Sequence, residues 1–293
     1  MGISSYLQFL VSGLTVGSTY GLTALGFTII FNTTGIINFA QGEFVMLGGM
    51  LSVFFLKWLH LGLPLSVLFS LLVTTLVGAA IEQFTIKPVK DSSVINLIIV
   101  TIGVSIFTRG LAMLIWGKDT FALPQFSGSA PLTFGGVAVT TQSIWILAIT
   151  LSLLFLLRAF FTKTIYGKGM LACSYDRKAS YLVGIGVQKM VLLSFMISAL
   201  VGAVGGAILA PVTMTSYDVG ILLGLKGFAA CIIGGLGNPF GAAAGGLLLG
   251  VLESFGAGVI SSAYKDAFAF LVLLILLFVK PSGLFGQTRV ERV

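Results

Sequence analysis

Long runs of apolar residues alternate with short polar breaks along the whole chain. Each run is close to the roughly 20 residues that an α-helix needs to cross a lipid bilayer. Glycines interrupt several runs, and the run at 221–236 is short for a complete crossing. The pattern therefore predicts a polytopic bundle of about eight to ten transmembrane helices. The nine apolar segments cover residues 6–31, 39–57, 65–86, 93–116, 142–161, 189–212, 221–236, 241–260 and 266–281.

The composition makes a water-soluble fold untenable. Of the 293 residues, 57% are hydrophobic and only 9% are charged, and the mean hydropathy is +1.10. Ordinary globular domains carry about a quarter charged residues. The chain has too little polar surface to cover a soluble body of this size, so we predict an all-α integral membrane protein.

Lysine and arginine residues divide unequally between the two sides that alternating spans define. Basic residues gather on the cytoplasmic side of membrane proteins. Eleven of the sixteen fall on the side of the C-terminal tail, four fall on the other side, and Lys226 lies inside a span. This predicts a cytoplasmic C-terminus and, for an odd number of spans, an external N-terminus. The eleven are Lys87, Lys90, Arg158, Lys163, Lys168, Arg177, Lys178, Lys189, Lys280, Arg289 and Arg292; the four are Lys57, Arg109, Lys118 and Lys265.

Glycines recur every four residues within three of the predicted spans. On a helix this spacing makes a flat stripe on which a second helix can pack closely. Close packing alone explains the stripes; helices that slide or rock during transport would use the same spacing. The pairs and triplets are Gly13, Gly17 and Gly21; Gly202 and Gly206; Gly241 and Gly245; and Gly246 and Gly250.

Motifs for chemistry are missing from the sequence. It contains no G-x-x-x-x-G-K-[ST] loop for ATP phosphates, no Ser/His/Asp set and no cluster of metal ligands. We therefore predict no catalytic residue, no metal site and no cofactor, and a protein that is not an enzyme.

Polar groups inside the predicted spans are the remaining clues. An ionised side chain at the bilayer centre costs about 2.5–3.5 kcal/mol on insertion scales, so it faces a partner or an aqueous cavity. Lys226 could pair with Glu253 or with Glu43. Alternatively, Asn38, Gln41 and Glu43 could line a water-accessible pathway or hold a broken helix, since non-helical backbone at this depth must be buried in protein or line a cavity.

The polar stretch 162–189 differs from the other breaks. It is too polar to cross the membrane and too long for a simple turn. Leu171, Tyr175, Lys178 and Leu182 follow helical spacing, and Gly184 gives a stop signal. We predict a short helix across the inner face that offers Asp176, Arg177 and Lys178 to a partner; the alternative is a solvated basic loop.

Four segments carry a resemblance to a known family. They are GSTYGLTALGFTIIFNTTGIINFAQGEFVMLGG (17–49), ACSYDRKASYLVGI (172–185), GLKGFAACIIGGLGNPFGAAAGGLLLGVLES (224–254) and YKDAFAFLVLLILLFVKPSGLFG (264–286). In this order they resemble the permeases of branched-chain amino acid ABC importers, specifically the LivH type.

The resemblance implies one permease domain over 1–293, with 162–189 as its cytoplasmic coupling loop. It also implies a place in the bacterial inner membrane and several partners: a LivM-like sister permease, two cytoplasmic ATPase subunits that hydrolyse ATP, and a periplasmic solute-binding protein. The substrate would be a branched-chain or related small amino acid; members of the family also serve urea, short amides and aromatic acids. Tyr175, Asp176, Arg177, Lys178, Leu182 and Gly184 would couple the permease to the ATPase.

Residues 36–44, IINFAQGEF, hold three of the polar groups inside the spans and also belong to the first segment of the family resemblance. Our hypothesis is that they break and cap the start of the second span beside the translocation pathway. Asn38 and Gln41 would satisfy freed backbone groups, and Glu43 would meet a cationic or hydrogen-bonding partner. A self-sufficient ion-coupled carrier that uses Glu43 and Glu253 is the alternative from another class, although such a carrier has no need of a coupling segment.

Overall fold

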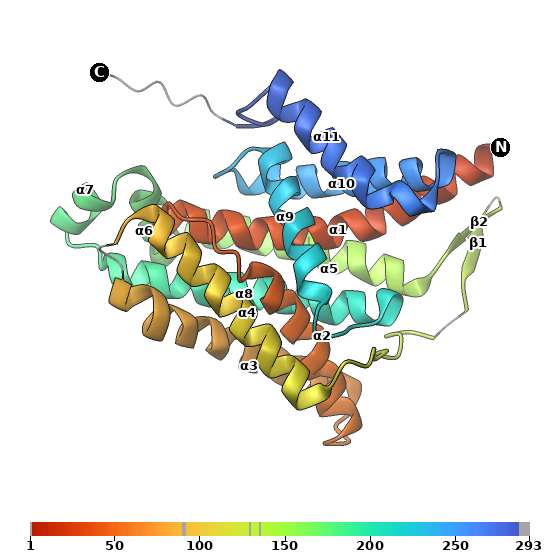
Figure 1. Cartoon of the computed structure of the whole chain (residues 1–293), viewed down its shortest axis with the longest axis horizontal. Helices are drawn as coiled ribbons and strands as arrows, with labels where there is room; N and C mark the ends of the chain where they lie inside the picture. The colour runs from red at the N-terminus through yellow and green to blue at the C-terminus, as the bar shows by residue number, and fades with distance from the viewer. Residues whose placement is uncertain (1, 90–91, 129, 135, 287–293) are drawn as a thin grey trace.

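The computed structural model describes residues 2–89, 92–128, 130–134 and 136–286. Lys90, Arg289 and Arg292, counted above on the cytoplasmic side, lie outside the described residues. Apart from one antiparallel hairpin and an isolated bridge, the regular structure of the described residues is helical, as predicted (Figure 1). The longer elements are α1 (Ile3–Thr34), α2 (Gln41–Lys57), α3 (Leu63–Ile81), α4 (Val94–Trp116), β1 (Leu132–Phe134), β2 (Val137–Val139), α5 (Thr141–Lys163), α6 (Ile165–Tyr175), α7 (Arg177–Leu182), α8 (Val187–Thr213), α9 (Val219–Gly234), α10 (Pro239–Val259) and α11 (Lys265–Val279); the short turns are η1 (Glu82–Ile86), η2 (Lys87–Val89) and η3 (Ser262–Tyr264).

Each of the nine predicted apolar segments corresponds to one of these helices. In the described part of the chain, seven helices are long and apolar enough to cross a membrane. The helices α2 and α9 have 17 and 16 residues, so they are about 24–26 Å long, less than the hydrocarbon thickness of about 30 Å. Non-helical residues 35–40 and 214–218 precede these two helices.

The two ends of the bundle differ in charge. We call the end that carries α6, α7 and Lys87 the basic end; the N-terminus and the β1–β2 hairpin lie at the opposite end (Figure 1). The chain from Leu284 to Phe285 hydrogen-bonds to the last residues of α9 at the basic end. The N-terminus and residue 286 therefore lie at opposite ends, as an odd number of crossings requires.

Glycine stripes allow the central helices to approach closely. A Cβ atom on Gly17 would lie 2.8 Å from the carbonyl oxygen of Gly246, and one on Gly246 would lie 2.2 Å from the backbone nitrogen of Gly21. These contacts join α1 to α10. A Cβ atom on Gly206 of α8 would lie only 1.8 Å from the carbonyl oxygen of Val45 in α2. The predicted close helix packing is confirmed, and α1, α2 and α8 form the buried centre of the bundle.

The stretch 162–189 contains two helices, so the prediction of one continuous short helix is wrong. α6 ends at Tyr175, and α7 begins at Arg177. Asp176 adopts an extended backbone, and its Oδ1 accepts hydrogen bonds from the backbone nitrogens of Lys178 (2.8 Å) and Ala179 (3.0 Å). An aspartate that caps the next helix competes with the backbone ladder and breaks the previous one. Gly184, with φ of 87°, follows the end of α7 as predicted.

Candidate functional site

Residues 35–40 pass through the interior of the bundle as non-helical backbone. The backbone nitrogen of Phe39 donates to Oγ1 of Thr101, well inside α4, at 3.1 Å. The side-chain Oδ1 of Asn38 accepts from the backbone nitrogen of Ala40 at 3.1 Å and makes a local turn before α2. These side chains supply partners for N–H groups that a helix start leaves free. Backbone of this kind is tolerated in a membrane only where protein or water covers it.

Gln41, the first residue of α2, joins the break to α8 and α1. Its Nε2 donates to the carbonyl oxygen of Ser198 at 3.3 Å. The Ser198 hydroxyl lies 2.5 Å from Oε1 of Gln41 and 2.9 Å from the carbonyl oxygen of Gly26. A Cβ atom on Gly26 would lie 1.9 Å from the Gln41 amide nitrogen, so a larger residue at this point of α1 would displace the Gln41 amide from its hydrogen bonds. Gln41 therefore binds to the neighbouring helices rather than pointing into an open pathway.

Glu43 lies in the first turn of α2 and is almost completely buried. The Ser105 hydroxyl of α4 donates to its Oε1 at 2.8 Å. Its Oε2 and the Nδ2 of Asn38 have no hydrogen-bond partner among the described residues. Arg109, one turn further along α4, acts on the carboxylate electrostatically. The carboxylate also sits at the N-terminal end of α2, where the helix dipole favours negative charge.

The two short helices meet at their N-terminal ends. A Cβ atom on Gly42 of α2 would lie 2.0 Å from the carbonyl oxygen of Gly220 in α9, and one on Gly220 would lie 2.8 Å from Oε2 of Glu43. Further along, the ring centroids of Phe39 and Phe228 are 5.5 Å apart. The break before α2 and the start of α9 are thus one packed unit, with Glu43 between them.

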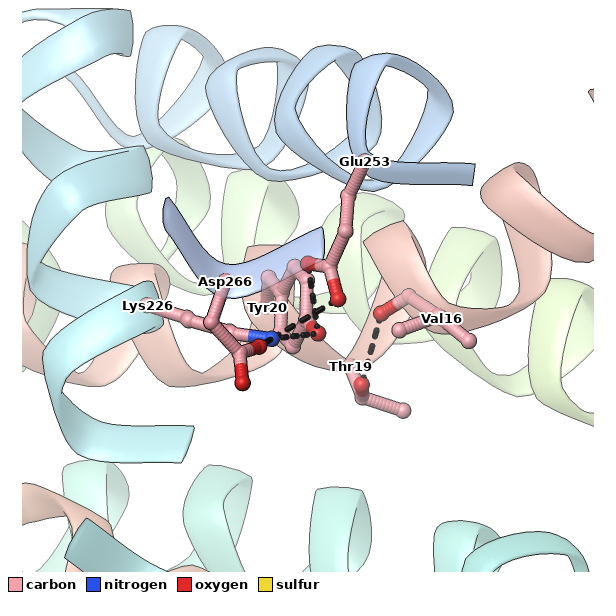
Figure 2. Close-up of polar contacts among 6 residues, drawn as sticks. All are labelled: Val16, Thr19, Tyr20, Lys226, Glu253 and Asp266. Carbon is pink, nitrogen blue, oxygen red and sulfur yellow. Dashed lines mark hydrogen bonds and ion pairs between the residues drawn. The ribbon is translucent and has the colours of Figure 1, made fainter. Parts of the chain in front are cut away.

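A second polar cluster joins α1, α9, α10 and α11 near the C-terminal end of α10 (Figure 2). Lys226 of α9 lies 2.8 Å from Oε1 of Glu253 in α10 and 2.5 Å from Oδ1 of Asp266 in α11. Its Nζ also donates to the Tyr20 hydroxyl of α1 at 3.1 Å, and that hydroxyl donates to Oε2 of Glu253 at 3.0 Å. Of the two partners left open for Lys226, Glu253 is the one in contact, and Glu43 belongs to the other cluster.

The residues predicted to couple the permease to an ATPase lie at the basic end, apart from both clusters. The side chains of Tyr175 and Leu182 are 87% and 84% exposed. Asp176, Arg177 and Lys178 are also exposed, and Arg177 donates to the carbonyl oxygen of Thr34 at 3.1 Å. This bond attaches α7 to the last residue of α1, directly before the break at 35–40.

Several members of these clusters escaped sequence reasoning. Ser105, Thr101 and Ser198 are ordinary hydroxyl residues in apolar helices, and their partners are 62 or 157 residues away. Tyr20 also gave no local signal. Asp266 could have been found, because it is the acidic residue in the first turn of the apolar helix α11.

Comparison with known proteins agrees with this architecture. The family described as branched-chain amino acid transport system / permease component matches residues 9–277. The chain belongs to this family. The permease is 36% identical to the high-affinity branched-chain amino acid transport system permease protein BraD of Pseudomonas aeruginosa, over 99% of both chains. It is 34% identical to LivH of Salmonella typhimurium, over 98% of both chains. The L-arabinose transport system permease protein AraH of Escherichia coli is 27% identical over 59% of this chain and 53% of its own.

The permease is therefore a multi-pass membrane component of a branched-chain amino acid ABC transport system. The similarity covers the break, the glycine stripes and both polar clusters, since all lie between residues 9 and 277. Membership also means that the permease works as one subunit of a larger ABC transporter complex.

Proposed function

We propose that the permease is the LivH-type subunit of a binding-protein-dependent importer in the bacterial inner membrane. One permease domain, residues 1–293, would translocate branched-chain amino acids or related small amino acids. A LivM-like sister permease, two cytoplasmic ATPase subunits that hydrolyse ATP and a periplasmic solute-binding protein would complete the complex. The observation that carries the proposal is the similarity to BraD and LivH over nearly the whole length of all three chains.

The surface of α4 and α9 supports a sister chain. Ile221, Leu222 and Leu225 of α9 are exposed, and so is Asp218 in the irregular segment just before this helix. Lipid does not cover irregular backbone within a membrane, so a protein or a water-filled pathway must do so. A second permease on this face would enclose a pathway lined by Ser105 and Arg109 of α4. The buried Glu43 of α2 would then lie behind α4, outside the pathway itself.

The proposed role of the break is to hold the pathway helices in place and let them move together. Gln41 and Glu43 support it because their contacts tie α2 to α8 and α4, and Ser198, the partner of Gln41, also bonds to α1. Asn38 supports it by holding the turn before α2. The ion pair of Lys226 and Glu253 would anchor α9, which packs against α2, to α10. These five residues would position the pathway rather than bind the substrate directly.

The proposed function predicts ATP-dependent uptake by the reconstituted complex only. Proteoliposomes that contain the permease, its sister and the ATPase subunits should accumulate labelled leucine when ATP and the binding protein are supplied. The permease alone should accumulate none under a proton or sodium gradient. Gradient-driven uptake by the permease alone would instead support the ion-coupled carrier. Uptake of urea, short amides or aromatic acids in preference to leucine would correct the substrate and retain the importer.

Glu43→Ala should lower uptake about tenfold or more without preventing assembly. A hydrogen bond to a charged group contributes about 1.5–3 kcal/mol, and each 1.4 kcal/mol is a factor of ten. Ser105→Ala removes the same bond from the α4 side, so the double variant should be little worse than either single one. Glu43→Gln keeps an acceptor for Ser105 and tests whether the charge is needed. Unchanged assembly, uptake and ATP hydrolysis in Glu43→Ala would refute this role for the break.

A further inference from the structure

A large cavity opens at the basic end of the permease. Its volume is about 980 Å³, and it lies between the end of α1, the turn η1 after α3, the start of α4, α7 and the start of α8. Sites for small molecules span about 300–1,000 Å³, so this cavity has room for a ligand. It is separate from the Glu43 and Lys226 clusters, whose residues do not line it.

The charge in this cavity is strongly one-sided. Four basic residues line it, Lys87, Arg177, Lys178 and Lys189, against one acidic residue, Glu82. Among the described residues, none of the four makes an ion pair, since both ion pairs found there belong to Lys226. Lys87 and Arg177 donate to neutral groups instead, the Gln83 side chain at 3.1 Å and the Thr34 carbonyl oxygen at 3.1 Å.

The other wall of the cavity is apolar. Ile36, Ile86, Leu97 and Val191 line it and are buried, and Val187 lies beside them. Leu97 and Val191 are the fourth and fifth residues of the membrane-spanning helices α4 and α8, and Ile86 lies near the end of the α3 span. The cavity therefore combines a basic rim with an apolar wall near the ends of three membrane-spanning helices.

We propose that this cavity binds an anionic phospholipid of the cytoplasmic leaflet, with the phosphate at the basic rim and the first acyl carbons along the apolar wall. Basic pockets between helices on the cytoplasmic side of membrane proteins suit such headgroups, because each lysine or arginine near the surface contributes about 1 kcal/mol of attraction. A soluble anion would gain nothing from the apolar wall. The proposal uses the orientation given by the basic residues and does not depend on the transported substrate.

A bound lipid would contact two segments to which the proposed function assigns a role in transport. Arg177 and Lys178 belong to α7, while Thr34 and Ile36 flank the start of the break before α2. A phospholipid in the cavity would therefore contact the coupling region and the break at the same time. Its presence should stabilise the arrangement in which α7 is held against the end of α1.

The test compares two pairs of lysines in the full-length permease, purified with its partner subunits. Lys87→Gln with Lys189→Gln removes two cavity charges outside the coupling residues. Lys163→Gln with Lys168→Gln removes two exposed charges at the same end that do not line the cavity. Binding is measured by native mass spectrometry and by thermal shift, with phosphatidylglycerol and phosphatidylcholine of identical acyl chains.

The unmodified complex should bind phosphatidylglycerol in preference to phosphatidylcholine. The cavity pair should weaken phosphatidylglycerol binding by about 30-fold, while the control pair should leave it within about twofold. Equal binding of both lipids, or equal losses in both pairs, would overturn the proposal. Displacement of the lipid by millimolar inorganic phosphate would reassign the cavity to a soluble anion, and lipid binding that occurs only after the ATPase subunits are removed would reassign the cavity to a protein contact.

Discussion

Lys226→Met should leave little folded permease in the membrane. Lys226 is 4% exposed and is the shared partner of Glu253, Asp266 and Tyr20. Methionine fills a similar volume but leaves Glu253 buried with the Tyr20 hydroxyl as its remaining contact. Breaking a buried ion pair from one side costs about 3–5 kcal/mol, a large share of the 5–15 kcal/mol by which proteins are typically stable.

The measurement is thermal unfolding in detergent, together with the amount of full-length protein in the membrane. Lys265→Met is the matched control, because Lys265 is adjacent to Asp266 in sequence and exposed, and it makes no ion pair within the described part of the chain. Adding Glu253→Gln to Lys226→Met should recover much of the loss, since no buried charge then lacks a partner; Asp266 is half-exposed and can be hydrated. A double variant no more stable than Lys226→Met would show that the charge balance is not the cause.

The helices could be predicted from the sequence because hydropathy is a local signal. The apolar segment at 221–236 even shows that α9 is short, and the glycines at 13, 17 and 21 mark the face of α1 that contacts α10. The break at Asp176 could not be predicted in the same way. Helical spacing continues through this residue, and its capping bonds to the next helix overrule the spacing.

The candidate site was predictable only in its centre. Three polar residues in an apolar stretch had to be buried with partners, so Asn38, Gln41 and Glu43 stood out. Their partners did not, because a serine in a membrane helix has the same appearance whether it bonds to its own helix, as Ser194 does, or to another, as Ser198 does. The choice between Glu43 and Glu253 for Lys226 depends on how α9 is rotated, and sequence spacing does not determine that rotation.

Tyr175→Ser combined with Leu182→Ser should abolish uptake while the permease still folds. Both side chains are more than four-fifths exposed, so their loss removes little packing within the chain. If the ATPase covers these side chains, burying each of them would contribute about 1.5–3 kcal/mol to the binding free energy. Losing about 3 kcal/mol in total corresponds to binding that is roughly 100-fold weaker. The ATPase should then hydrolyse ATP without driving transport, or dissociate from the membrane.

The control is Leu59→Ser with Tyr264→Ser, which removes the same two residue types from exposed positions away from α6 and α7. This variant should bind the ATPase and transport normally. A single cysteine at position 182 provides an independent measurement, since the native Cys173 and Cys231 are buried. A membrane-impermeant thiol reagent should label Leu182→Cys only from the cytoplasmic side, and bound ATPase should protect it. Labelling from the external side, or no protection by the ATPase, would rule out α7 as the docking element, because a helix that transmits ATP-driven movement has to touch the subunit that hydrolyses ATP.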